Sequence, residues 1–239
     1  MERVKTGIQG LDNMIGGGLP KESTTLVSGP PGGGKSIFCF QFLYEGVKKG
    51  EKCLFLTLDK QVEGLLTQSK ELGIDFQPFI ENNTVKFLFL NINKKLVYET
   101  MTNEILSGEY DRIVLDSITP LSEMPISLKS IEVDNNMDIA DSEELLSETN
   151  APLRRLHLRY IMNALETSKA TSVITSELPT GSSFLSRDGI SEFLADGVVT
   201  LSLDPTMDRR KLSIMKMRNT KHSLKPHDIS IDYGGIKLI

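Results

Sequence analysis

Residues 23–46, STTLVSGPPGGGKSIFCFQFLYEG, decide the fold of this chain. They begin with the β-branched and apolar run Thr24–Val27, which predicts a buried strand. The octet GPPGGGKS at 29–36 follows and matches the phosphate-loop pattern G-x-x-x-x-G-K-[ST]. Apolar residues at helical spacing then predict a helix from Ile37 to Val47. A phosphate loop between a strand and a helix predicts nucleotide binding.

The octet supplies the groups that a phosphate chain needs. Glycines allow positive φ and a close approach of the backbone, and the N–H groups of the loop and of the following helix then face an anion. Lys35 is expected to bind the β- and γ-phosphates, and Ser36 is expected to ligate Mg²⁺. An accidental Lys-Ser pair in a glycine-rich turn is the alternative, which the flanking strand and helix disfavour. The predicted nucleotide contacts are Gly29, Pro30, Pro31, Gly32, Gly33, Gly34, Lys35, Ser36 and Ile37.

The composition is that of an ordinary globular protein. Its 239 residues predict one domain, 1–239, with a sizeable core. No apolar run approaches the length of a membrane span, and the N-terminus lacks a signal-peptide core, so a cytoplasmic protein without membrane contact is expected. A net charge of −5 argues against indiscriminate binding to nucleic acid. Cys39 and Cys53 lie among apolar neighbours and are expected to be buried free thiols rather than a disulfide.

Strands and helices alternate along the rest of the chain. Strands are predicted at 52–58, 84–92, 112–117 and 171–176, and helices at 62–72, 96–106 and 153–165. This alternation is typical of an α/β fold with a mostly parallel sheet, in which ligands bind at the carboxyl ends of the strands. Asp59 and Asp116 follow two of these strands and should therefore share one edge with the phosphate loop. Such an edge suits phosphoryl transfer.

Three segments depart from this alternation. Residues 6–20 are rich in turns, and the glycines at 16–18 could equally form a flexible turn or an edge of the nucleotide site. Residues 120–150 carry eight acidic residues and one basic residue, a net charge of −7, and predict an acidic loop or insertion. From residue 198 onward, the runs at 198–203, 211–217 and 228–233 predict an antiparallel meander.

Once these residues are placed, the chain resembles the KaiC-type branch of the RecA-like ATPases over nearly its full length. The resemblance is carried by motifs in order: TGIQGLD at 6–12, GGLP at 17–20, TLVSG at 25–29, QFLY at 41–44, VLDSIT at 114–119, Arg154-Arg155, TSE at 175–177, ADGVV at 195–199 and KMRNTKH at 216–222. It implies a RecA-like P-loop NTPase with a central, mostly parallel sheet flanked by helices. It also implies ATP and Mg²⁺ as cofactors, bound where protomers meet in a homo-oligomer, commonly a hexamer.

The resemblance also suggests roles for particular residues. Asp116 matches the Walker B carboxylate that holds Mg²⁺ through water, whereas otherwise it would be an ordinary carboxylate at a strand end. Lys216 and Arg218 match the charged pair that reaches the γ-phosphate of a neighbouring protomer, and His222 matches a residue close to the same nucleotide. Solvated side chains on an edge strand are the alternative for Lys216 and Arg218.

The chain departs from the family pattern in two places. Asp59 and Lys60 stand where the family has two adjacent glutamates, the first of which acts on the attacking water. Asp59 is therefore the candidate catalytic carboxylate beside Lys35, but it is shorter than glutamate by one C–C bond, about 1.5 Å. A displacement of that order costs about 10²-fold in rate, which makes hydrolysis slow or undetectable. Asn219 replaces a family glycine, and asparagine tolerates positive φ better than most residues.

Three functions fit these observations. The favoured one is a slow, oligomeric KaiC-like ATPase that switches partner proteins of unknown identity. The second is a RadA-type DNA-binding recombination or repair ATPase, which the acidic segment 120–150 disfavours because it would repel phosphates, although Arg154, Arg155 and Arg159 follow it. The third is a nucleotide-binding assembly subunit without turnover, which Asp59 and Lys60 would suit.

Overall fold

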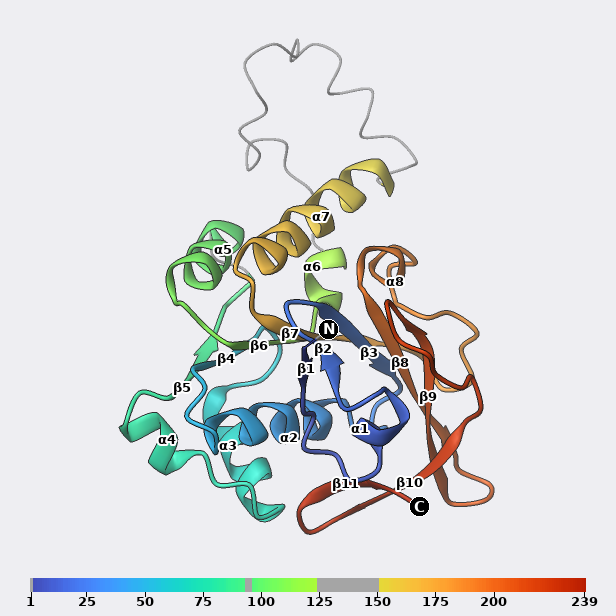
Figure 1. The fold of residues 1–239 in the computed structure, drawn as a ribbon. Coiled ribbons are helices and arrows are strands. Elements are labelled where there is room, and N and C mark those ends of the chain that lie inside the picture. The colour runs from blue at the N-terminus through green and yellow to red at the C-terminus, as the bar shows by residue number, and fades with distance from the viewer. Residues whose placement is uncertain (1, 93–95, 124–150) are drawn as a thin grey trace.

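The computed structural model describes residues 2–92, 96–123 and 151–239. Its centre is a mixed sheet with helices on both faces (Figure 1), as the sequence predicted. The strands of this sheet, in spatial order, are β11 (Gly235–Leu238), β10 (His227–Asp232), β9 (Arg209–Met217), β8 (Gly197–Asp204), β3 (Thr24–Gly29), β7 (Thr171–Glu177), β6 (Arg112–Asp116), β4 (Cys53–Thr57) and β5 (Val85–Phe89). A separate two-stranded ribbon pairs β1 (Arg3–Val4), just before the turn-rich segment 6–20, with β2 (Leu19–Pro20), at the end of that segment. The acidic stretch expected at 120–150 falls outside the described residues from 124 onward.

Six neighbouring strands run parallel and form one side of the sheet. They are β3, β4, β5, β6, β7 and β8. From β8 the chain continues as the antiparallel meander that the sequence predicted, through β9 and β10. A further strand, β11, completes the meander and was not predicted.

Helices cover both faces of the sheet, and each face has its own core. The longer helices are α2 (Lys35–Val47), α3 (Val62–Glu71), α5 (Val97–Ser107) and α7 (Ala151–Thr167), all near their predicted bounds. Short helices were not predicted: α1 (Leu11–Met14), α4 (Gln77–Glu81), α6 (Thr119–Glu123) and α8 (Ser191–Leu194). Alternate residues of one strand serve the two cores, since Phe55 packs with the α2 layer and Leu56 with the α5–α7 layer. Within the described residues, no helix is long and apolar enough to cross a membrane.

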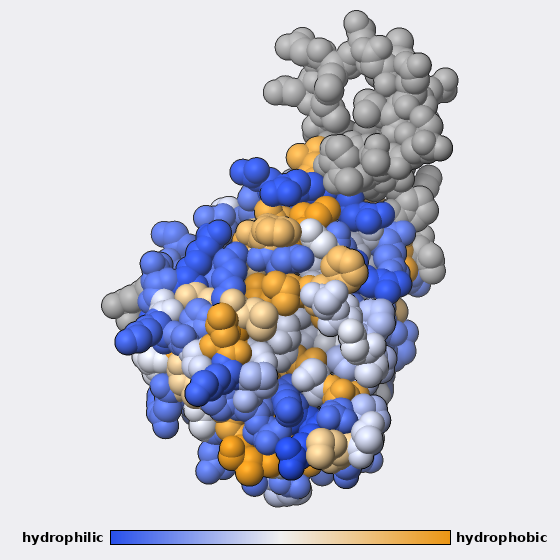
Figure 2. Space-filling view, turned by 90° about the vertical axis from the view of Figure 1, so that its right-hand side faces the viewer, coloured by the Kyte–Doolittle hydropathy of each residue, from blue (hydrophilic) through white to orange (hydrophobic). Residues whose placement is uncertain are grey.

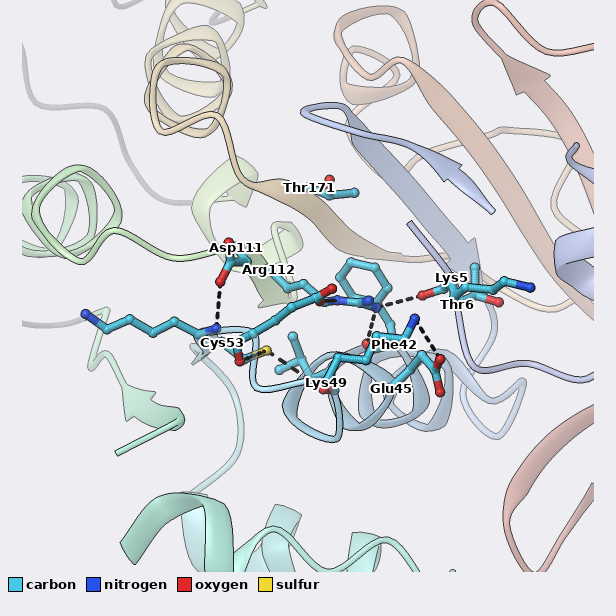
Figure 3. Close-up of polar contacts among 12 residues, drawn as sticks. Lys5, Thr6, Phe42, Glu45, Lys49, Cys53, Asp111, Arg112 and Thr171 are labelled. Carbon is cyan, nitrogen blue, oxygen red and sulfur yellow. Dashed lines mark hydrogen bonds and ion pairs between the residues drawn. The ribbon is translucent and has the colours of Figure 1, made fainter. Parts of the chain in front are cut away.

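A buried arginine joins the amino ends of the strands to α2. The side chain of Arg112, the first residue of β6, is 1% exposed and forms an ion pair with Glu51. It donates to the carbonyl oxygens of Lys5 and Phe42, each at 2.7 Å, and its guanidinium lies over the Phe42 ring (Figure 3). A Cβ at Gly46 would lie 2.6 Å from Arg112 Nε, so glycine is required where α2 passes the guanidinium. Both cysteines are buried and free, as predicted.

A buried glutamine joins α2 to the C-terminal hairpin of β10 and β11. Gln41 Nε2 donates to the carbonyl oxygens of Gly234 and Ile236, each at 3.1 Å. Its Oε1 accepts the Ile236 amide at 2.7 Å. The hairpin is thereby held behind the phosphate loop, since a Cβ at Gly34 would lie 3.1 Å from Ile231 Cδ1.

Candidate functional site

The phosphate loop, residues 29–36, connects the carboxyl end of β3 to the start of α2. Gly32 and Gly34 have φ of 76° and 105°, values that favour glycine. A Cβ at Gly29 would lie 2.5 Å from the Leu201 carbonyl oxygen, so β8 also requires glycine there. Phe38 donates the first helical hydrogen bond, to Gly34 O, which leaves the N–H groups of the first turn pointing out of the helix end. The loop has the shape of an anion nest.

Lys35 folds back over this loop. Its ammonium group donates to Gly29 O at 2.9 Å and to Pro30 O at 3.1 Å. Burial lowers the pKa of Lys35, and the negative charges of Glu177 and Asp116 oppose that shift. The ammonium group therefore stands where the phosphates of a nucleotide would meet it and is held by two carbonyl oxygens that a phosphate oxygen can replace.

The predicted metal ligands meet directly. Ser36 Oγ donates to Asp116 Oδ2 at 2.7 Å, and Thr175 Oγ1 donates to Asp116 Oδ1 at 2.5 Å. A hydroxyl and a carboxylate beside an anion nest are the hard oxygen donors that Mg²⁺ prefers, and this ion usually keeps several waters. The residues present therefore fit Mg²⁺, which would occupy the space between this pair and the phosphates.

Asp59, the candidate catalytic carboxylate, lies on the same edge of the sheet. Its Oδ2 accepts a hydrogen bond from Ser117 Oγ at 3.1 Å, and Ser117 follows Asp116. Desolvation raises the pKa of Asp59, the Ser117 hydrogen bond opposes the shift, and the charges of Glu177 and Asp116 add to it. A carboxylate with a raised pKa is a better proton acceptor than an ordinary one. The geometry thus brings together Lys35, Ser36, Asp59 and Asp116, as the order of the strands predicted.

Lys216 and Arg218 lie at the other edge of the same sheet. Lys216 donates to the carbonyl oxygens of Glu192 and Ala195, and Arg218 pairs with Asp196 at 2.9 Å. Asp196 in turn accepts the amide of Thr24, the first residue of β3. The phosphate loop begins at the other end of β3, about 17 Å along a strand of this length. The structure therefore does not bring these side chains to the phosphate loop of their own chain.

The turn after Arg218 has the conformation that its sequence predicted. Asn219 has φ of 54°, a left-handed conformation that glycine and asparagine adopt most readily. Its carbonyl oxygen accepts a hydrogen bond from Arg3, and Arg3 also donates to Thr220. His222, on the same connection, approaches Thr220 O through Nδ1 at 3.0 Å. His222 thus lies with Lys216 and Arg218 and away from its own phosphate loop.

Sequence reasoning gave no role to two polar residues of the site, Thr175 and Ser117, and considered a third, Glu177, only as a substitute for Asp59. Thr175 and Ser117 orient the carboxylates of Asp116 and Asp59, and Glu177 accounts for the largest attractive charge effect on Lys35. Each lies at the carboxyl end of β6 or β7, the strands that stand between β3 and β4. Their position at those strand ends was the available signal.

Comparisons with known proteins agree with this geometry. The family model described as "ATPase: KaiC" matches residues 4–239. Among curated relatives, UPF0273 protein PH0284 of Pyrococcus horikoshii is 30% identical over 239 residues, covering 98% of this chain and 92% of the relative. UPF0273 protein MJ1359 of Methanocaldococcus jannaschii is 30% identical over 241 residues, covering 99% and 96%.

A solved structure gives the same result. The crystal structure of KaiC-like protein PH0186 from Pyrococcus horikoshii superimposes with a TM-score of 0.79 at 29% identity, covering 100% of this chain and 99% of that one. The family model, the relatives and the shared fold point the same way, and the chain belongs to the KaiC ATPase family.

Proposed function

We propose that residues 1–239 form one ATPase domain that binds ATP with Mg²⁺ and works as a slow, nucleotide-gated switch in a homo-oligomer. The observation that carries this proposal is the meeting of Lys35, Ser36 and Asp116 at one edge of the sheet. Lys35 and the loop amides bind the phosphates, and Ser36 and Asp116 hold the metal ion. Bound Mg²⁺ supplies charge neutralisation at the β- and γ-phosphates.

Slow turnover follows from the position of Asp59. Its side chain is one methylene shorter than the glutamate that the family pattern has there, and Ser117 holds it by a hydrogen bond. A water aligned by Asp59 therefore lies further from the line of attack, while the groups that bind the ground state are intact. Binding and turnover should accordingly be separable in this protein.

Assembly follows from the distance between the two edges of the sheet. Lys216, Arg218 and His222 reach a γ-phosphate only if a second copy of the chain presents its phosphate loop to them, as in a six-membered ring. Figure 2 views the molecule from the side that carries β8, β9 and α8, where hydrophobic residues lie among hydrophilic ones. Phe193 of α8 and Met215 of β9 are exposed large hydrophobics, which suit an interface better than open solvent.

The test of nucleotide binding is calorimetry with ATP·Mg²⁺ on the wild type and Lys35→Ala. Loss of a charged hydrogen-bond donor to phosphate should weaken binding by about 100-fold. Lys70→Ala is the matched control, because Lys70 is exposed at the end of α3 and, within the described ranges, pairs with Asp75 alone. Equal affinity of Lys35→Ala and wild type would refute the proposed phosphate site.

The test of assembly is size-exclusion chromatography with light scattering, with and without ATP·Mg²⁺. A mass of six protomers in the presence of nucleotide is expected. A monomer under both conditions would refute the shared site and leave Arg218 without a role at the phosphates.

A further inference from the structure

Lys60 lies at the rim of the phosphate site, in the position of an acid in the family pattern. Its backbone is fixed at the carboxyl end of β4 by Thr57, whose hydroxyl accepts the Lys60 amide at 3.2 Å and donates to the Lys60 carbonyl oxygen at 3.1 Å. The side chain is exposed. The backbone of Lys60 is therefore held at a fixed position, while its ammonium group lies in solvent.

The ammonium group of Lys60 has no partner in the described part of the chain. No hydrogen bond or ion pair involves its Nζ there, although three carboxylates, Asp59, Asp116 and Glu177, stand on the same edge of the sheet. Asp59 is bound by Ser117, and Asp116 is bound by Ser36 and Thr175. A cation that stays unpaired beside these acids is available to a ligand.

The backbone brings Lys60 close to the phosphates. Thr57 pairs with Asp116 in the β4–β6 register, and Asp116 contacts Ser36 of the phosphate loop. Lys60 is near enough to Lys35 that its charge contributes to lowering the pKa of Lys35, after the larger effect of burial. A second positive charge beside the phosphate loop favours a ligand with more negative charge there than a diphosphate brings.

We propose that Lys60 is a second phosphate-binding lysine, which contacts the terminal phosphate of a nucleoside triphosphate and makes the site prefer triphosphate over diphosphate. This inference rests on the proposed binding of nucleotide by residues 29–36. Lys35 would contact the β-phosphate, which both ligands carry, as well as the γ-phosphate, whereas Lys60, at the end of β4 beside Asp59, would contact the γ-phosphate alone.

The test compares two ligands on three variants. Calorimetry measures the affinity of the non-hydrolysable analogue AMPPNP with Mg²⁺, and of ADP with Mg²⁺, for wild type, Lys60→Met and Lys60→Arg. We expect Lys60→Met to weaken AMPPNP binding by about 10-fold and ADP binding by about 2-fold or less, the effect of one exposed charged contact. Lys60→Arg should keep the wild-type preference. Lys70→Met, which removes a charge far from the phosphate loop, should change neither affinity.

The outcomes separate this inference from the proposed function. If Lys60→Met lowers both affinities by the same factor, or lowers neither, Lys60 does not contact the terminal phosphate selectively and this inference is wrong. The proposed phosphate site at residues 29–36 is unaffected by that result. If the wild type binds neither ligand, the proposed function itself fails.

Discussion

The two edges of the parallel sheet differ in how tightly their charged side chains are bound by the rest of the protein. At the amino edge, Arg112 is buried and bound by Glu51 and two carbonyl oxygens. At the carboxyl edge, polar groups are open: Lys35 is held only by loop carbonyls, and Lys60 has no partner in the described ranges. The same elements connect the edges, since β6 runs from Arg112 to Asp116. One edge fixes α2 and β6 to each other, and the other keeps their ends available for a ligand.

The first prediction concerns Arg218, which does not fit this division between the two edges, and its expected effect on phosphate release is the largest. Arg218 stands at the amino edge, where it pairs with Asp196, but we propose that it acts on the phosphates of another copy. Arg218→Ala should lower the slow phosphate release of the wild type at saturating ATP·Mg²⁺ to below detection, since an arginine supplied in trans contributes roughly 10³-fold or more to the rate. Arg159→Ala, an exposed arginine of α7, is the control.

Mixing variants sharpens this experiment. Arg218→Ala copies have an intact phosphate loop, and Lys35→Ala copies have an intact Arg218. Each preparation alone should be inactive, and the mixture should recover part of the activity. No recovery on mixing, in a sample that still assembles, would place Arg218 with the structural residues of the amino edge.

The second prediction removes the centre of the amino edge. Arg112→Ala leaves Glu51 and two carbonyl oxygens without their donor and opens a cavity beside Phe42, so stability should fall by about 3–5 kcal/mol. Urea denaturation measures the loss. Nucleotide affinity of the folded fraction at low temperature should stay within about 2-fold of wild type, since no atom of the phosphate site is removed. If Arg112→Ala instead caused a large loss of nucleotide affinity with little loss of stability, Arg112 would act in ligand binding and not in holding the fold together.

The third prediction lengthens the carboxylate at the other edge. Asp59→Glu restores about 1.5 Å of reach, and steady-state phosphate release should rise by up to about 10²-fold. Affinity for ATP·Mg²⁺ should change little, because the gain lies in the transition state. Asp59→Asn is the matched control and should not gain turnover. If wild type is already fast and Asp59→Glu is no faster, Glu177 becomes the candidate for the catalytic carboxylate.

The smallest effect concerns stability and pH. Burial raises the pKa of Asp59 above its ordinary value of 3.8, so the folded protein binds that proton more tightly than the unfolded chain. Protonated Asp59 therefore favours folding and ionised Asp59 disfavours it. The stability contributed by the protonated carboxyl group is fully present below pH 3.8 and is lost as the pH rises through the raised pKa. Because the side chain is open to solvent on one side, Asp59→Asn should gain only about 0.5 kcal/mol at pH 7.

Thermal unfolding across pH checks this sign. The advantage of Asp59→Asn should shrink as pH falls toward 4. An advantage that grew on acidification would mean that the folded state depresses the pKa of Asp59.

The sequence predicted the carboxyl edge better than the amino edge, for a physical reason. Lys35, Ser36 and Asp116 lie in a local motif or directly after an apolar strand, and the alternation of strands and helices brings strand ends together. Arg112 could not be assigned, because its partners are distant in sequence: the register of β4 with β6 brings Glu51 close, and Lys5 comes from the segment that follows β1. Short elements such as β11 and α4 were missed because four or five residues show no period.

The contact of Gln41 with the C-terminal hairpin affects when the phosphate loop becomes supported during synthesis of the chain. The phosphate loop is synthesised early in translation. The ribosome adds Ile231 and Ile236, which pack behind Gly34, about two hundred residues later. Until then Gln41 lacks the partners that hold α2 against the hairpin, and an unfinished chain exposes the back of its loop. A nascent chain thus gains a braced phosphate loop only after the β10–β11 hairpin has been synthesised.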